Sequence, residues 1–207
     1  MKAVALGLRA IKGGAVLVGV ALAGGEPRVV LSTFLATHAE GDRLSAEPYH
    51  VAAELVRDSP GGVSAEAAAA VAEGRKRQDQ VAAQGLREIL LGLGQSGWKP
   101  AIVALLVNRA GWVTDLLEYS LAYPEHVPVA EGLAVRDALR FACKDCRIDL
   151  AELDEKSLPD RAAPALATPS VSIDARLKAL GETAGKPWRK EQKLACLAAW
   201  FALAALP

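Results

Sequence analysis

The sequence predicts one α/β domain with a mixed sheet, in which a three-stranded antiparallel meander is followed by parallel strands and flanked by helices. Three apolar runs within residues 1–37, separated by short Gly or Gly-Pro breaks, predict the meander. A long helical stretch then leads into the apolar run at residues 101–107. Because a helix between two strands is the usual crossover of parallel pairing, this run is expected to lie parallel to the first strand.

The first run alternates two kinds of side chain, because neighbouring residues of a strand point to opposite faces. Val4, Leu6 and Leu8 share one face, whereas the other face carries small residues and ends at Arg9. The small residues predict that a helix or a ligand approaches closely on that face. The second run, residues 15–23, is nearly all apolar, which predicts a strand covered on both faces.

A secretory signal is the alternative interpretation of this N-terminal stretch. Lys2, Arg9 and Lys12 would form its basic region, residues 15–22 its apolar core and residues 21–23 its cleavage site. The basic region would already be rich in apolar residues, which favours the meander.

The rest of the chain alternates predicted helices with two further strands. Helices are expected at residues 48–58, 64–93, 112–123, 129–143 and 187–206, and strands at residues 101–107 and 146–153. Residues 159–169 contain three prolines and four alanines, so a segment at about residues 157–186 is expected to be an irregular excursion with a helical turn or two. Residues 1–207 are expected to form a single domain.

The composition is that of a globular protein and gives no general attraction for nucleic acid or membranes. Apolar residues make up 52% of the 207, and 24 basic residues balance 24 acidic ones, so nucleic-acid binding would require a local patch. The densest basic run, residues 75–77, is interpreted as a solvated helix face. No apolar run reaches the roughly 20 residues that span a bilayer, so no membrane partner is expected. Three cysteines favour a reducing cytoplasm.

Cys143 and Cys146 form a C-x-x-C pair at the end of a predicted helix. A second ligand pair for zinc is absent, because Cys196 stands alone and the three histidines lack metal-binding spacing. Redox pairs normally lie at a helix start, where the dipole stabilises the thiolate. The cysteines are therefore predicted to be inert.

The order of three antiparallel strands, helix, parallel strand, helices, strand and helix resembles the ribonuclease H-like superfamily. The segments ALGLR and AVLVGVAL around a Gly turn, LREILLGLGQSGWKPAIVALLVNR, and the closing KEQKLACLAAWFAL are similar to the branch that contains Holliday junction resolvases. Nucleases of that family hold divalent metals on carboxylates, because hard cations need oxygen ligands. The resemblance implies acids near the end of the first strand, at the end of the central parallel strand and at the start of the last helix.

Basic or amide residues stand at these positions in this sequence. The expected acids fall at Arg9, at Asn108 or Arg109, and near Lys190 or Lys193. The leading interpretation is therefore a non-catalytic, degenerate nuclease that needs no cofactor and acts as a binding or scaffolding protein, with nucleic acid or another protein as its partner. A convergence of Arg9, Arg109 and Lys193 would create a basic pocket for a phosphate or carboxylate. The candidate ligand-binding residues are Arg9, Lys12, Asn108, Arg109, Lys190 and Lys193.

Two alternatives stay open at this point. One is a divergent nuclease that holds Mg or Mn on displaced carboxylates, for which the candidates are Glu118, Asp149, Glu152 and Glu191. The acidic run at residues 152–155 is otherwise interpreted as solvated loop charges. The other alternative is a protein-interaction subunit, such as a homo-oligomer. Trp112, Tyr119 and Tyr123 are expected in the core, whereas an exposed set would mark a partner surface.

Overall fold

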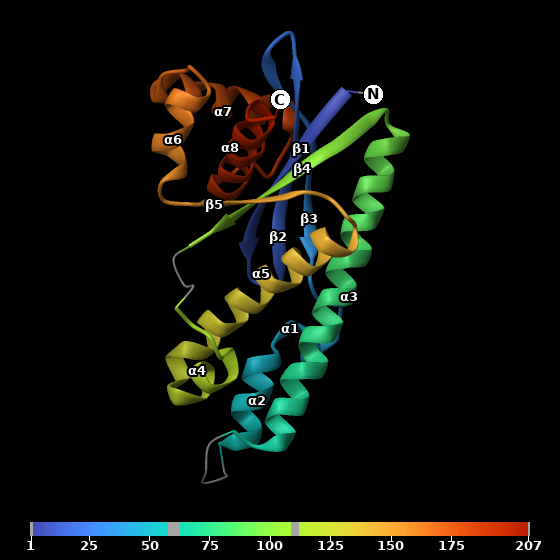
Figure 1. Ribbon diagram of the computed structural model, residues 1–207, viewed down its shortest axis with the longest axis vertical. Helices are drawn as coiled ribbons and strands as arrows, with labels where there is room; N and C mark the ends of the chain where they lie inside the picture. Colours follow the sequence, from blue (N-terminus) through green and yellow to red (C-terminus); the bar gives the residue numbers. More distant parts are fainter. Residues whose placement is uncertain (1, 58–62, 109–111, 207) are drawn as a thin grey trace.

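The computed structural model describes residues 2–57, 63–108 and 112–206, and shows a five-stranded sheet with helices on both faces (Figure 1). The spatial order of the strands is β3-β2-β1-β4-β5. The antiparallel meander consists of β1 (Lys2–Ile11), β2 (Gly14–Ala23) and β3 (Glu26–Ala36). β4 (Trp98–Val107) pairs parallel with β1, and β5 (Leu150–Asp154) pairs parallel with β4. The predicted fold class is confirmed.

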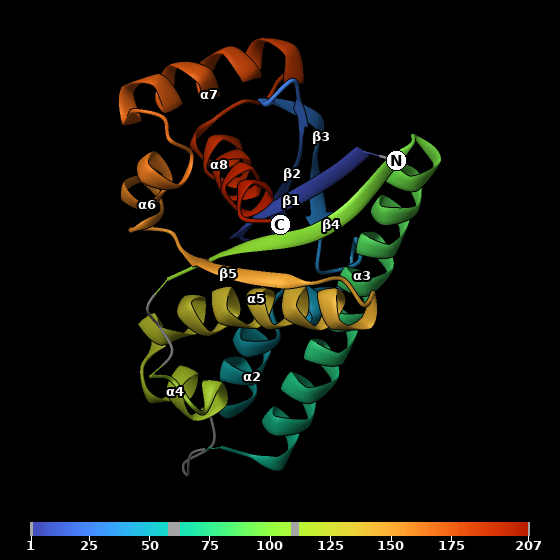
Figure 2. The same ribbon diagram turned by 45° about the horizontal axis from the view of Figure 1, so that its top comes forward.

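Helices form one layer on each face of the sheet (Figure 2). One layer is α3 (Ala65–Gln95) and α5 (Val127–Asp145). The other layer is α8 (Lys190–Ala204), with α6 (Leu158–Ala165) and α7 (Ser170–Ala184) packed outside it. No helix in the described part of the chain is long and apolar enough to cross a membrane.

A further group of helices lies beyond the carboxyl ends of β1 and β4 (Figure 1). It consists of α1 (Arg43–Ala46), α2 (Pro48–Val56) and α4 (Leu116–Ala122), and a short 3-10 helix (Pro124–His126) precedes α5. Tyr49 and Ala52 of α2 are buried against the N-terminal parts of α3 and α5. This group encloses the pockets described below.

The two faces of β1 carry the side chains that the alternation predicts. Val4, Leu6 and Leu8 pack in the core beneath α3 and α5. On the opposite face, a Cβ atom at Gly7 would overlap the Ala195 carbonyl oxygen of α8, so a residue without a side chain is required there. The predicted close approach of a helix is confirmed.

β2 is buried from Gly14 to Ala21, which confirms the prediction of a strand covered on both faces. Its neighbours are β1 on one side and β3 on the other. The residues assigned to the apolar core of a signal peptide therefore form an interior strand of the sheet.

The segment expected to be irregular is instead mostly helical, which corrects that prediction. α6 and α7 occupy it. Pro159 lies in the first turn of α6 and Pro169 immediately precedes α7, and proline is well accepted at both places because no helical N–H bond is lost. Ile173, Leu177 and Leu180 are buried along one side of α7, a helical spacing that outweighs the proline content.

Two other predicted elements are shorter or shifted. Asp115 caps α4, its Oδ1 accepting hydrogen bonds from the amides of Leu117 and Glu118 at 2.9 Å each, so the helix begins after the expected residue 112. Cys146 ends α5 rather than beginning a strand, and β5 starts only at Leu150.

Candidate functional site

The carboxyl ends of β1, β4 and β5 lie at one edge of the sheet, because these three strands are parallel. Arg9 lies near the end of β1, opposite Leu106 of β4. Glu155 immediately follows β5, and Glu191 lies in the first turn of α8. The fold therefore brings together residues that are up to 182 positions apart.

Arg9 is bound to both carboxylates, and we name these three residues the Arg9 cluster. Its Nε donates to Glu155 Oε2 at 3.1 Å and its Nη2 donates to Glu155 Oε1 at 2.9 Å, a bidentate pair. Its Nη1 lies 3.5 Å from Glu191 Oε1. The side chains of Arg9, Glu155 and Glu191 are 19%, 27% and 34% exposed. A guanidinium thus fills the space between two partly buried carboxylates.

This arrangement uses the carboxylate oxygens that a hard metal ion would need. Both oxygens of Glu155 and one oxygen of Glu191 already face the guanidinium. Among the described residues, no group of three or more His, Cys, Asp and Glu side chains is placed to hold a metal ion.

The four carboxylates suggested as displaced metal ligands lie in different places. Glu118 is exposed on α4, and Glu191 belongs to the Arg9 cluster. Glu152 accepts hydrogen bonds from Arg140 at 2.6 and 3.1 Å, and these bonds lower the pKa of its carboxyl. Asp149 immediately precedes β5, and its carbonyl oxygen accepts a hydrogen bond from Val103 in the middle of β4, so it lies roughly 20 Å from the Arg9 cluster at about 3.3 Å per strand residue.

A groove next to the Arg9 cluster is lined by three arginines, and we name it the Arg136 groove. It is a cavity of about 530 Å³ beside the end of β4. Arg75 pairs with Asp137 at 2.6 Å, and Arg140 pairs with Asp137 at 2.9 Å and with Glu152. Arg136, which lies between these pairs on α5, forms no ion pair with any described residue.

Arg136 is also the least satisfied of these cations. Its Nε is buried and has no hydrogen-bond partner in the described parts of the chain. Burial lowers the pKa of the guanidinium, and the neighbouring charge of Arg140 lowers it further. The groove therefore holds a half-buried positive charge for which an anion would be a favourable partner.

The other residues predicted to bind a ligand fall at separate sites. Asn108 lines the Arg136 groove. Lys12 lines a pocket between the β1–β2 turn and α5. Lys190 and Lys193 line a groove between α8 and the α6–α7 pair. Arg109 lies outside the described residues.

Sequence reasoning missed two residues at this edge. Glu155 belongs to an acidic run that was interpreted as solvated. Its position directly after the last strand could have indicated that it lies near Arg9, which is close to the end of β1. Arg136 lies in a predicted helix that was considered only for its apolar side. No local pattern distinguishes it from Arg140, four residues later, which is paired.

The cysteines agree with the prediction that they are inert. Cys143 and Cys196 are buried, and burial raises the pKa of each thiol to about 12. Cys146 is half-buried, and its pKa is also raised by burial. None of the three has the lowered pKa of a reactive thiolate.

Trp112 and Tyr123 are exposed and Tyr119 is half-buried, which corrects the expectation that these aromatic residues lie in the core. Trp112 is 69% exposed and Tyr123 is 58% exposed. Tyr119 stacks on His126 with ring centroids 3.9 Å apart, and Trp112 meets the Tyr119 ring edge-on at 5.4 Å. We name these four residues the exposed aromatic patch, after its exposed members Trp112 and Tyr123.

No protein-family model and no curated protein sequence matches this chain. Among solved structures, the chain is similar to the Thermus thermophilus RuvC structure, with a TM-score of 0.47, 10% sequence identity, and coverage of 97% of this chain and 93% of that chain. It is also similar to T. thermophilus RuvC in complex with Holliday junction substrate, with a TM-score of 0.48, 9% identity, and coverage of 96% and 91%. Likeness at this level does not indicate which ligand this chain binds.

Proposed function

We propose that this chain is a ribonuclease H-like binding protein without metal-dependent nuclease activity, and that it holds the phosphates of a nucleic acid at the carboxyl edge of its sheet. The observation that carries the first half of the proposal is the bidentate pair between Arg9 and Glu155, with Glu191 at 3.5 Å.

A metal ion at this position would compete with the guanidinium for the same oxygens. Arg9 is only 19% exposed, so a displaced guanidinium would need a new partner or a path to water. Two carboxylates and an arginine carry one net negative charge, which attracts a divalent cation far less than a cluster of three carboxylates does.

Arg136 supports the second half of the proposal. It is a half-buried cation without an ion-pair partner among the described residues, in a groove large enough for a sugar-phosphate unit. A phosphate accepts planar, paired hydrogen bonds from a guanidinium, and such bonds are stronger where water is excluded. Arg136 supplies one phosphate contact, and the number would rise to about three only if Arg75 and Arg140 also left their carboxylate partners for phosphate.

The test is a cleavage assay with Mn²⁺ or Mg²⁺ on single-stranded, duplex and branched DNA and on an RNA–DNA hybrid, with binding measured in the same samples. We expect no cleavage, and binding that weakens with salt at a slope of roughly −0.7 to −2.7 in log K against log[salt], for one to three phosphate contacts. Arg136→Gln should weaken binding about fivefold to tenfold, the loss of one charge-assisted contact.

Arg87→Gln is the matched control, because it removes the same charge from α3. Arg87 pairs with Asp145 at the other end of α5, away from the groove. Cleavage that disappears in Glu155→Gln or Glu191→Gln would instead make the chain a divergent nuclease. Absence of binding at low salt would refute the nucleic-acid half of the proposal.

The exposed aromatic patch favours a second candidate function, that of a protein-interaction subunit. Exposed Trp and Tyr side chains are typical of interface centres, because they bury much apolar area at a low entropic cost. Self-association that is detected by sedimentation and lost in the Trp112→Ala, Tyr123→Ala double variant would favour a homo-oligomer. Monomeric behaviour of the parent at high concentration would count against it.

A further inference from the structure

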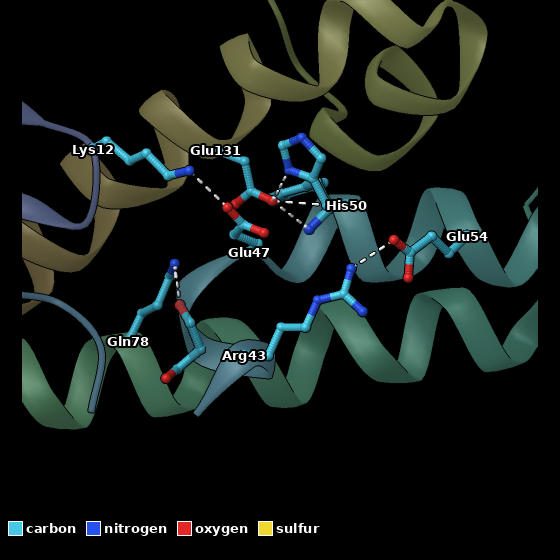
Figure 3. A network of polar contacts seen from close by, with 9 residues as sticks. Lys12, Arg43, Glu47, His50, Glu54, Gln78 and Glu131 are labelled. Atoms are coloured by element: carbon cyan, nitrogen blue, oxygen red, sulfur yellow. Dashed lines mark hydrogen bonds and ion pairs between the residues drawn. The ribbon is translucent and has the colours of Figure 1, made fainter. Parts of the chain in front are cut away.

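A second pocket lies on the other side of Arg136, and we name it the Glu131 pocket. It is a cavity of about 380 Å³ between the end of β1, the β1–β2 turn, the start of α2 and the first half of α5. Ile11, Pro128 and Val135 provide apolar walls. Figure 3 shows Lys12 of the β1–β2 turn, Glu47 and His50 at the start of α2, and Glu131 of α5 converging here.

Glu131 has one oxygen engaged and one oxygen free. Its Oε1 accepts hydrogen bonds from the backbone amides of Tyr49 at 2.8 Å and His50 at 3.0 Å, which lie in the first turn of α2 (Figure 3). The same oxygen lies 3.3 Å from His50 Nδ1. These contacts hold the carboxyl group in one orientation, as a cap supplied from α5. Its Oε2 is buried and has no hydrogen-bond partner in the part of the chain that the structure describes.

Arg136 also lines the pocket and supplies the complementary group. Among the described residues, its buried Nε is a donor without an acceptor, just as Glu131 Oε2 is an acceptor without a donor. The two residues are five positions apart on α5, a rise of about 7.5 Å at 1.5 Å per residue. Burial disfavours the charged form of both groups, raising the pKa of Glu131 and lowering the pKa of Arg136.

The pocket has open space beside Gly132. Gly132 lines the pocket, and a Cβ atom built there would meet no atom within 4 Å. At the rim, Lys12 Nζ pairs with Glu47 Oε1 at 2.8 Å, but Lys12 is 86% exposed. An ion pair with so exposed a lysine contributes little to stability.

We propose that the Glu131 pocket binds a small organic zwitterion, with an ammonium group that donates to Glu131 Oε2, a carboxylate that accepts from Arg136, and an apolar body between them. Each end of the ligand satisfies a buried polar atom that the chain leaves without a partner. The apolar body replaces water against Ile11, Pro128 and Val135. Binding here is a property beyond nucleic-acid association, although the two sites share Arg136.

The test uses three probes that differ only in their ends: 4-(aminomethyl)benzoate, benzoate and benzylamine. Each is titrated into the full chain by NMR or calorimetry at up to about 10 mM, since ligands with so few atoms bind in the millimolar range. We expect 4-(aminomethyl)benzoate to bind about tenfold more tightly than either single-ended probe. Equal affinity of the three probes, or no binding of the zwitterion, would overturn the proposal.

Gly132→Leu blocks the pocket without touching either polar group. A leucine side chain extends into the open space, and leucine is a better helix former than glycine, so the variant should fold with equal or greater stability. Gly92→Leu is the matched control, because Gly92 is also helical with open space around it but lies on an exposed part of α3. Binding of the zwitterion should disappear in Gly132→Leu and persist in Gly92→Leu.

Glu131→Gln tests separately the proposed contact between Glu131 and the ammonium group of the ligand. The amide keeps an oxygen to cap α2 but removes the negative charge, so the preference for the zwitterion over benzoate should disappear. A Gly132→Leu variant that binds the zwitterion as the parent does would refute the site. Nucleic-acid binding is measured in the same variants, and we expect it to be unchanged, which separates this proposal from the proposed function.

Discussion

Replacing Arg9 by methionine tests the Arg9 cluster, because methionine keeps an unbranched apolar stem and removes the guanidinium. The variant leaves Glu155 and Glu191 near one another, 27% and 34% exposed, with no cation between them. A hydrogen bond to a charged group contributes about 1.5–3 kcal/mol. The partial exposure of the cluster reduces this through solvent screening, so we expect a net loss of about 2 kcal/mol of unfolding free energy.

Thermal and denaturant unfolding measure this loss. For a chain of this size, about 2 kcal/mol corresponds to a fall of roughly 4–8 °C in Tm. A double-mutant cycle with Glu155→Gln isolates the pair and should give a coupling energy of about 1–2 kcal/mol. Arg87→Met is the control, because the Arg87–Asp145 pair is 55% and 38% exposed and should contribute less than about 1 kcal/mol. Equal losses in the Arg9 and Arg87 variants would refute the reasoning.

A second variant at Arg9 tests whether the cluster can be converted into a metal site. Arg9→Asp places a third carboxylate beside Glu155 and Glu191, which is the oxygen-rich arrangement that Mn²⁺ and Mg²⁺ favour. We expect Mn²⁺ to raise the Tm of this variant and not that of the parent, by linkage of binding to folding. A similar Mn²⁺ effect in the parent would mean that a metal ion can already enter the site beside Arg9.

Three other features of the chain give predictions that the same measurements check. Gly7→Ala should lower the unfolding free energy by about 3 kcal/mol because of its overlap with α8, whereas Gly92→Ala should raise it by about 0.5–1 kcal/mol in urea unfolding. Cys143 and Cys196 should not react with a disulfide reagent at pH 8 until the chain unfolds, since burial raises both pKa values to about 12; fast reaction in the native state would contradict this. Burial raises the pKa of the Glu131 carboxyl in the folded chain above its ordinary value of 4.5. Protonation of Glu131 therefore stabilises the fold fully below pH 4.5, and this stabilisation is lost as the pH rises through the raised pKa. Glu131→Gln should flatten that part of the curve of Tm against pH.

The sheet could be predicted from the sequence because its signals are local. Alternation in β1 fixes which residues face which helix layer, and the continuous apolar character of β2 indicates a strand covered on both faces. The crossover rule then makes β4 parallel to β1. Each of these inferences needs no more than one strand and its connection.

The candidate site could not be predicted in the same way, because its contacts depend on how distant elements meet. Arg9 and Glu155 are 146 positions apart, and Glu131 caps a helix 81 positions before it. A charged residue at a strand end gives no local indication of whether water or another charge will be its partner. For the same reason the sequence did not show that Arg136 has no ion-pair partner among the described residues. Arg140 lies four residues later on the same helix and is paired.

Arg9 places a positive charge where two carboxylates meet at this edge of the sheet. The topology alone brings Glu155, after β5, and Glu191, at the start of α8, to the same place. Two carboxylates held close together repel one another unless a cation lies between them. Where that cation is a metal ion, stability depends on its concentration through linkage. Here the cation between the two carboxylates is a side chain of β1, so under the proposed function the charge balance of this edge should not vary with metal supply.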